Sequence, residues 1–165
     1  MRPLYEIGIR AWVTQVLIPL GSNDVIYANE GKPRPIPPYA TVQTFSDTMF
    51  GLPERETVYD SDLDQIENLI KTTNNGTGSV SIFGDGHNEA ARTLVASTWR
   101  QSTINLIKPY GLAVYGPTVT ILATDSDGVT ENRSIVSITY SWAYVDSEIT
   151  NDWIESVILT GEIIP

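Results

Sequence analysis

Cysteine is absent from this chain of 165 residues, and histidine occurs once. The absence of cysteine excludes disulfides, thiolate zinc sites and cysteine nucleophiles, and it is compatible with assembly in a reducing cytosol. No apolar run approaches the roughly 20 residues of a membrane-spanning helix, so we expect no membrane partner.

Basic residues are also scarce, because 10 Lys and Arg stand against 20 Asp and Glu, for a net charge of −10. Proteins that grip nucleic acid need clustered Lys and Arg to displace counterions. We therefore expect no specific DNA binding, although the charge fits both plain solubility and a surface that DNA slides past. The length predicts a single domain over residues 1–165.

The only histidine, His87, lies near Asp85 at a predicted helix start, where a Ser-His-Asp triad could use it. No Gly-x-Ser-x-Gly nucleophile motif accompanies it, so we expect a surface residue. Glu54 and Glu56 could flank a glycosidic bond, but such pairs arise by chance in an acidic run. We predict no enzyme activity and no catalytic residue.

Residues 125–128, Asp-Ser-Asp-Gly, resemble the opening of a calcium loop. That loop needs Gly at position 6 and Glu at position 12, where this chain has Thr130 and Val136. The segment therefore predicts a turn. No glycine-rich phosphate loop is present, and we expect neither a metal nor a cofactor.

The N-terminal residues predict a helix from about Leu4 to Leu17. One helical face is apolar with the expected 3.6-residue period: Tyr5, Ile9, Trp12, Val13 and Val16. Much of the opposite side is apolar too: Leu4, Ile7, Ala11 and Ile18. A helix this apolar must be covered on more than one side, so we expect a sheet on one side and a neighbouring subunit on the other.

Residues 31–38 are rich in proline, which predicts a stiff extended lead-in, with an interdomain linker as the alternative. Short strands are predicted over 25–27 and 38–45. Between Asp47 and Glu67 seven acids accompany a single base. We predict a protruding hairpin or arm over 47–78, with a turn at 74–78, and leave an acidic loop as the alternative.

The second half predicts a strand over 79–83 and then a helix with Asp85 as its N-cap. The apolar stripe of this helix contains Ala91, Leu94, Val95, Thr98 and Trp99. A short helical piece over 104–108 follows. The remaining strands are predicted at 112–115, 118–123, 135–145 and 153–163.

The strand over 135–145 has the clearest alternation, with one inward row: Val136, Ile138, Tyr140, Trp142 and Tyr144. The order of the elements shows no regular βα alternation. We therefore predict an α+β fold, a mainly antiparallel sheet with two principal helices packed on one face and a protruding arm.

Four segments in the same order carry a family resemblance: Pro33-Arg-Pro-Ile-Pro-Pro-Tyr-Ala-Thr41, Ser79–Gly84, Arg133–Tyr144 and Ile154–Glu162. Together they resemble the neck or tail terminator proteins of long-tailed bacteriophages. The resemblance implies a structural virion protein, assembled in the host cytoplasm, that forms a ring, usually a homohexamer. It implies that the ring caps the tail tube and joins tail to head, during viral assembly and genome ejection. The implied partners are the tail tube or sheath protein and the head-tail connector proteins, while DNA passes through unbound.

The resemblance does not assign residues to these contacts, so we choose them from the pattern. The expected subunit interface comprises Leu4, Ile7, Ala11, Arg34, Met49, Phe50, Leu52 and Tyr59. The expected acidic channel lining comprises Asp60, Asp62 and Asp64. The alternative is a monomeric β-rich binding module of a virion, with exposed aromatic residues for a carbohydrate or a host protein. Because the aromatic residues that we can place lie on core stripes, we prefer the assembly protein.

Overall fold

The structure is a computed structural model, and it describes residues 2–31, 33–60, 65–126 and 129–150. The chain forms two compact units, which we take one at a time: Met1–Leu52 with Thr72–Tyr144, and Pro53–Lys71 with Val145–Pro165. The strand expected over 153–163 lies outside the described residues, and the single domain remains a prediction.

Three α-helices and five strands make up the described chain, with a short 3-10 turn after α1 and another after α3. The helices are α1 (Leu4–Leu17), α2 (His87–Ser97) and α3 (Gln101–Ile107). The strands are β1 (Val25–Tyr27), β2 (Tyr39–Asp60), β3 (Gln65–Phe83), β4 (Leu112–Ser126) and β5 (Val129–Thr150).

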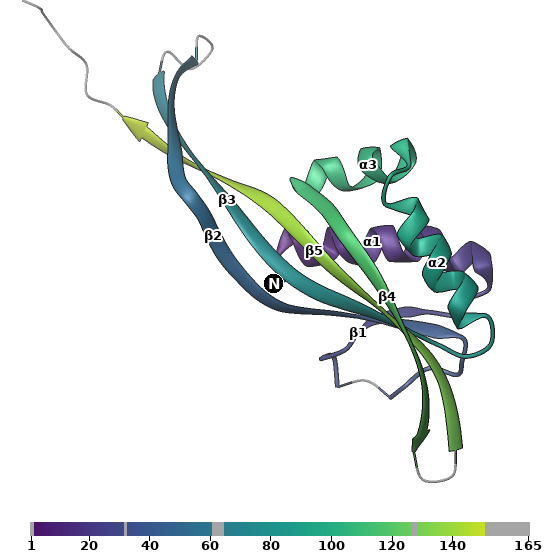
Figure 1. Cartoon of the computed structure of the whole chain (residues 1–165). Coiled ribbons are helices and arrows are strands. Elements are labelled where there is room, and N and C mark those ends of the chain that lie inside the picture. The colour runs from purple at the N-terminus through teal and green to yellow at the C-terminus, as the bar shows by residue number, and fades with distance from the viewer. Residues whose placement is uncertain (1, 32, 61–64, 127–128, 151–165) are drawn as a thin grey trace, which may run out of the picture. The chain divides into compact units, whose positions relative to one another are not determined.

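The strands form one sheet in the order β1-β2-β3-β5-β4. β1 pairs with β2 in parallel over three residues, and β4 pairs with β5 in antiparallel fashion. In the first unit, the three helices lie together over one face of the sheet (Figure 1). This mostly antiparallel arrangement confirms the predicted α+β class.

The core of the first unit lies between α1 and the sheet. Trp12 is fully buried, and its indole N–H donates a hydrogen bond of 2.8 Å to Ser97 Oγ, which ties α1 to α2. The ring of Tyr5 stacks on Tyr140 and on Trp142, with centroids 5.3 and 5.1 Å apart. The predicted apolar face of α1 is therefore its core face.

On the inward row of β5, Val136, Ile138 and Tyr140 are buried, as the alternation predicts. Burial then declines along the strand, because Trp142 is half-buried and Tyr144 is exposed. Tyr5, near the start of α1, covers Tyr140 and Trp142, so the row is a core row only as far as the helix reaches.

Residues 36–38 bend before β2, whereas the sequence predicted an extended lead-in throughout. Tyr39 and Phe83 stack there with centroids 4.6 Å apart. Gly84 has φ near +100°, and a Cβ on it would lie 2.9 Å from Pro38 Cα. The proline-rich segment thus packs directly against the end of β3.

The predicted turn over 74–78 is wrong, because these residues belong to β3. A Cβ on Gly78 would lie 2.7 Å from the Gln43 carbonyl oxygen, so this glycine allows a close approach of two strands and does not form a turn. Residues 47–60 and 65–78 lie in β2 and β3, which are much longer than the strands predicted at 38–45 and 79–83.

Two smaller expectations also fail. Gly86, with φ near +77°, stands before the first residue of α2, and no side chain caps the helix, so Asp85 is not its N-cap. The strands predicted at 112–115 and 118–123 are one strand, β4, with an irregularity between Tyr115 and Thr118. Pro117, which lacks a backbone donor, lies at that irregularity.

Candidate assembly surfaces

His87 takes part in a structural hydrogen-bond network. The Ser134 hydroxyl donates to Asn88 Oδ1 at 2.9 Å, so it accepts its 2.7 Å hydrogen bond from the His87 Nδ1–H. Ser134 is fully buried, and within the described residues no carboxylate is hydrogen-bonded to His87 or Ser134. The network fixes the start of α2 to β5.

Within residues 2–31, 33–60, 65–126 and 129–150, no three His, Cys, Asp or Glu side chains are grouped so that they could hold a metal ion. No helix in that part of the chain is long and apolar enough to cross a membrane. The calcium-like segment includes residues 127–128, which lie outside the described residues.

The predicted outer face of α1 is open to solvent. Leu4 and Ile7 are exposed and Ala11 is half-buried. Ile7 and Ala11 line a shallow groove of about 690 Å³ between α1 and the segment that contains Tyr27 and Glu30. An apolar floor of this kind suits a protein partner better than a small ligand, since small-ligand sites are mostly deep and enclosed.

The polar side chains that line this groove, Arg2 and Arg10, are held in place by contacts within the same chain. The Arg2 guanidinium lies 3.8 Å from the Tyr27 ring centroid and forms ion pairs with Glu6 at 3.1 Å and Glu30 at 3.4 Å. Arg10 Nε donates a 2.8 Å hydrogen bond to the Val25 carbonyl oxygen. These side chains are ordered before any partner arrives, which lowers the entropy cost of binding.

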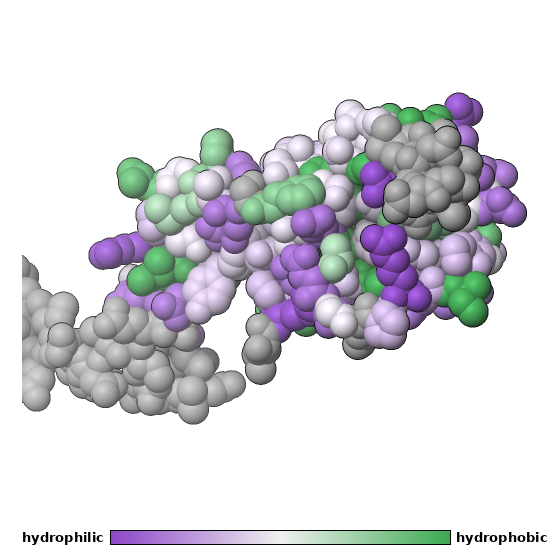
Figure 2. All heavy atoms as spheres, turned by 90° about the horizontal axis from the view of Figure 1, so that it is seen from below, coloured by the Kyte–Doolittle hydropathy of each residue, from purple (hydrophilic) through white to green (hydrophobic). Residues whose placement is uncertain are grey.

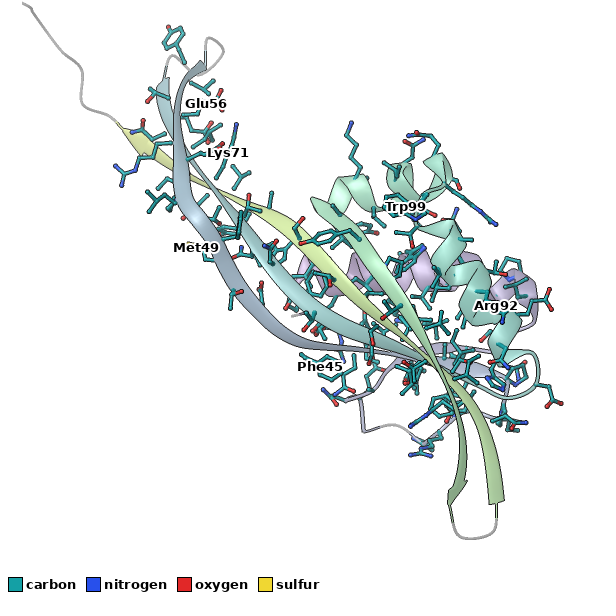
Figure 3. All side chains as sticks on the ribbon, viewed as in Figure 1. Phe45, Met49, Glu56, Lys71, Arg92 and Trp99 are labelled. Carbon is teal, nitrogen blue, oxygen red and sulfur yellow. The ribbon has the colours of Figure 1, made fainter. Side chains whose placement is uncertain are left out.

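A second apolar surface follows β2 within the first unit. β1 pairs with β2 only from Ala40 to Val42, and the described chain has no further pairing between these strands. Beyond that point four large apolar side chains are exposed: Phe45, Met49, Phe50 and Leu52. Leu52 is 90% exposed, and Figure 3 shows Phe45 and Met49 on the side of β2 away from the helices. An edge strand with this composition is a ready site for another protein.

The remaining predicted site residues are less informative. Arg34 is exposed in the first unit, and Tyr59 is exposed in the second. The side chain of Asp60, and Asp62 and Asp64 altogether, lie outside the described residues. The acidic channel lining therefore stays a prediction.

The outer surface of α2 and α3 was missed by the sequence reasoning. Trp99 was placed on the core stripe, but α2 ends at Ser97 and Trp99 is 72% exposed. In Figure 3, Arg92 lies on α2 and Trp99 lies at the junction of α2 and α3, and both side chains are exposed. A sequence signal was available, because no acid occurs between Glu89 and Asp125 in a chain that has 20 acids.

On the face seen in Figure 2, hydrophobic side chains lie in separate spots among hydrophilic ones. An α+β scaffold with apolar side chains exposed on one helix and one edge strand defines a class of protein that works through contacts with other proteins. The chain belongs to the phage neck terminator protein family, whose family model matches residues 6–165. Comparison with curated proteins finds no match.

Family membership indicates a structural role in the tail or neck of a bacteriophage particle, with contacts to other tail or head proteins. This agrees with a protein that is not an enzyme.

Proposed function

We propose that the protein forms a closed homo-oligomeric ring, a hexamer, that caps the tail tube and joins the tail to the head. Membership of the neck terminator family supports the place of action. Self-association is supported by the large apolar side chains that a single copy leaves exposed on α1 and β2: Leu4, Ile7, Phe45, Met49, Phe50 and Leu52. Such side chains gain about 1.5–3 kcal/mol each when they become fully buried.

The two apolar surfaces differ from each other, which favours a ring. One is a groove along α1 and the other is an edge strand, so neither resembles the self-complementary patch of a two-fold dimer. Contacts between unlike surfaces are heterologous, and they produce a closed ring when the rotation between subunits closes. The same principle explains termination: the ring matches the last ring of the tube on one side and presents a different surface on the other.

This role requires no catalytic step. The protein acts as a passive joint between the tail tube or sheath and the head-tail connector, and DNA crosses it without specific binding. The excess of acids supports free passage, because a wall with few Lys and Arg offers little counterion release to the DNA.

The test compares one substitution near each of the two opposite edges of the sheet. Leu52→Asp places a charge on the exposed apolar part of β2, and Ile121→Asp is the matched control on β4, where an exposed isoleucine lies on the opposite edge strand. Loss of a leucine contact worth about 1.5–3 kcal/mol weakens association roughly 10- to 150-fold.

We expect native mass measurement to show subunits for Leu52→Asp at concentrations where the wild type and Ile121→Asp form rings. Wild-type-like rings from Leu52→Asp would contradict a role for β2 in the contact.

A monomeric binding module is the second candidate. The exposed aromatic side chains of Trp99 and Tyr144 favour it, since such modules present aromatic residues to their ligands. A wild-type chain that stays monomeric at high concentration, and adds nothing to isolated tail tubes, would decide for this alternative.

A further inference from the structure

The outer surface of α2 and α3 differs in charge from the rest of the chain. It carries three exposed bases, Arg92, Arg100 and Lys108. No acid lies in sequence between Glu89 and Asp125, whereas the whole chain has a net charge of −10. We call this surface the basic helix face.

Apolar side chains accompany these bases. Trp99 and Ile104 are also exposed, on the turn after α2 and on α3. Arg92 and Ala96 are four residues apart on α2, so the exposed Ala96 lies on the same side of the helix as Arg92, while Trp99 lies in the turn after the helix. An exposed tryptophan followed directly by an exposed arginine, Arg100, has the composition of an interface hot spot.

The three bases have no ion pair within the part of the chain that the structure describes, in contrast to Arg2 and Lys71. Their positive charge is therefore available to an acidic partner. Arg is also suited to bidentate contacts with carboxylates.

The same chain has two exposed acids on one side of β2, and the intervening Arg55 alternates to the other side of the strand. Glu54 and Glu56 lie on β2 within the second unit, both are exposed, and their positions alternate to the same side of the strand. They are about 7 Å apart along the strand, from the rise of about 3.3 Å per residue. Lys71 pairs with Glu56, while Glu54 has no ion pair within the described chain.

We propose that the basic helix face binds the acidic β2 segment around Glu54 and Glu56 of a neighbouring copy, with Trp99 as the apolar anchor. This contact deepens, and rests on, the proposed ring. It joins two unlike surfaces, so it has the head-to-tail geometry that ring closure requires. Opposite charges also orient the two copies before contact and disfavour like-to-like pairing.

Nucleic acid is the other acidic ligand that such a face could meet. Three bases on a chain with a net charge of −10 offer little counterion release, which disfavours it. A short DNA duplex is therefore included in the test as a competing ligand.

The test is a charge swap between two variants. The first, Arg92→Glu with Arg100→Glu, reverses the basic helix face. The second, Glu54→Arg with Glu56→Arg, reverses the acidic segment. Lys71→Gln is a control that breaks the pair with Glu56 but keeps the acids, and Thr118→Glu with Thr120→Glu adds acid at exposed positions of β4.

Each charge-reversed variant alone should associate at least about tenfold more weakly than the wild type at low salt. Thr118→Glu with Thr120→Glu should associate normally, and Lys71→Gln, which frees Glu56 from its ion pair, should associate at least as tightly as the wild type. An equal mixture of the two variants should assemble again, because every contact between unlike copies then joins opposite charges. Trp99→Ala should weaken association without lowering the melting temperature of the monomer.

Two results would overturn the inference while the proposed ring stands: normal rings from either reversed variant, or no recovery in the mixture although the wild type forms rings. A short DNA duplex that binds the wild type but not Arg92→Glu with Arg100→Glu would likewise assign the face to nucleic acid. A wild type that forms no ring would contradict the proposed function itself.

Discussion

Trp142→Ala tests how far the core extends along β5. Trp142 is half-buried, its ring stacks on Tyr5 at a centroid distance of 5.1 Å, and its indole N–H donates a 3.0 Å hydrogen bond to Asp47 Oδ1. The stacking contributes about 0.5–1.5 kcal/mol and the hydrogen bond about 1 kcal/mol. Burial of about half of a tryptophan, on the order of 100 Å², contributes roughly 2 kcal/mol more, and the terms overlap.

We therefore expect Trp142→Ala to lower the free energy of unfolding by about 2–3 kcal/mol, less than the roughly 3–5 kcal/mol of a fully buried aromatic residue. Trp99→Ala is the matched control. Because Trp99 is 72% exposed, this substitution should lower the free energy of unfolding by less than about 0.5 kcal/mol. The assay is urea denaturation followed by far-ultraviolet circular dichroism, at one low protein concentration so that association does not add stability.

A cost below about 1 kcal/mol for Trp142→Ala would show that α1 does not cover this end of β5. An equal cost for Trp99→Ala would contradict the exposed position of Trp99.

Three further predictions concern single groups and charge. His87→Ala should lower the free energy of unfolding by about 1–2 kcal/mol, because it leaves the buried Ser134 hydroxyl without its donor. Rings should still form, and a variant that forms no rings at an unchanged melting temperature would reveal a functional site at His87. Burial, and then the nearby Tyr5, raise the pKa of Tyr140 above its ordinary 10.0, so its stabilising contribution is complete below pH 10 and is lost as the pH rises further. The free energy of unfolding should therefore fall less steeply above pH 10 in Tyr140→Phe than in the wild type, and equal slopes would contradict this. The predicted channel lining is tested by the triple variant Asp60→Lys, Asp62→Lys and Asp64→Lys, which should slow DNA ejection from assembled particles at low salt and less so at high salt. Unchanged ejection rates at both salt concentrations would show that these residues do not face the channel.

Periodicity alone was sufficient for the elements that lie directly on the core. The bounds of α1 and the buried positions of Val136, Ile138 and Tyr140 follow from repeats of 3.6 and 2 residues, because burial on one side dictates both patterns. The α+β class follows from the order of these elements.

The pattern failed where neighbouring strands, and not local sequence, decide the conformation. Residues 74–78 have the composition of a turn, but they form strand in β3, where the Thr48 hydroxyl donates to the Asn75 carbonyl oxygen at 3.3 Å. Pairing of this kind overrides local propensity, and it cannot be read from one segment alone.

The candidate interface was predictable in part. Apolar residues that belong to no core stripe, such as Ile7 and Leu52, were expected on an outer surface and are exposed. Trp99 was missed because its spacing continues the stripe of α2 past Ser97, where the helix ends. The charge pattern between Glu89 and Asp125 would have indicated that surface without any structure.

Ring closure on the tail is tested by native mass measurement of the purified chain, combined with negative-stain imaging after the chain is added to isolated tail tubes. We expect a closed homo-oligomer of six subunits and one added ring at a single end of each tube. A chain that remains monomeric at high concentration and leaves the tube ends unchanged would contradict it.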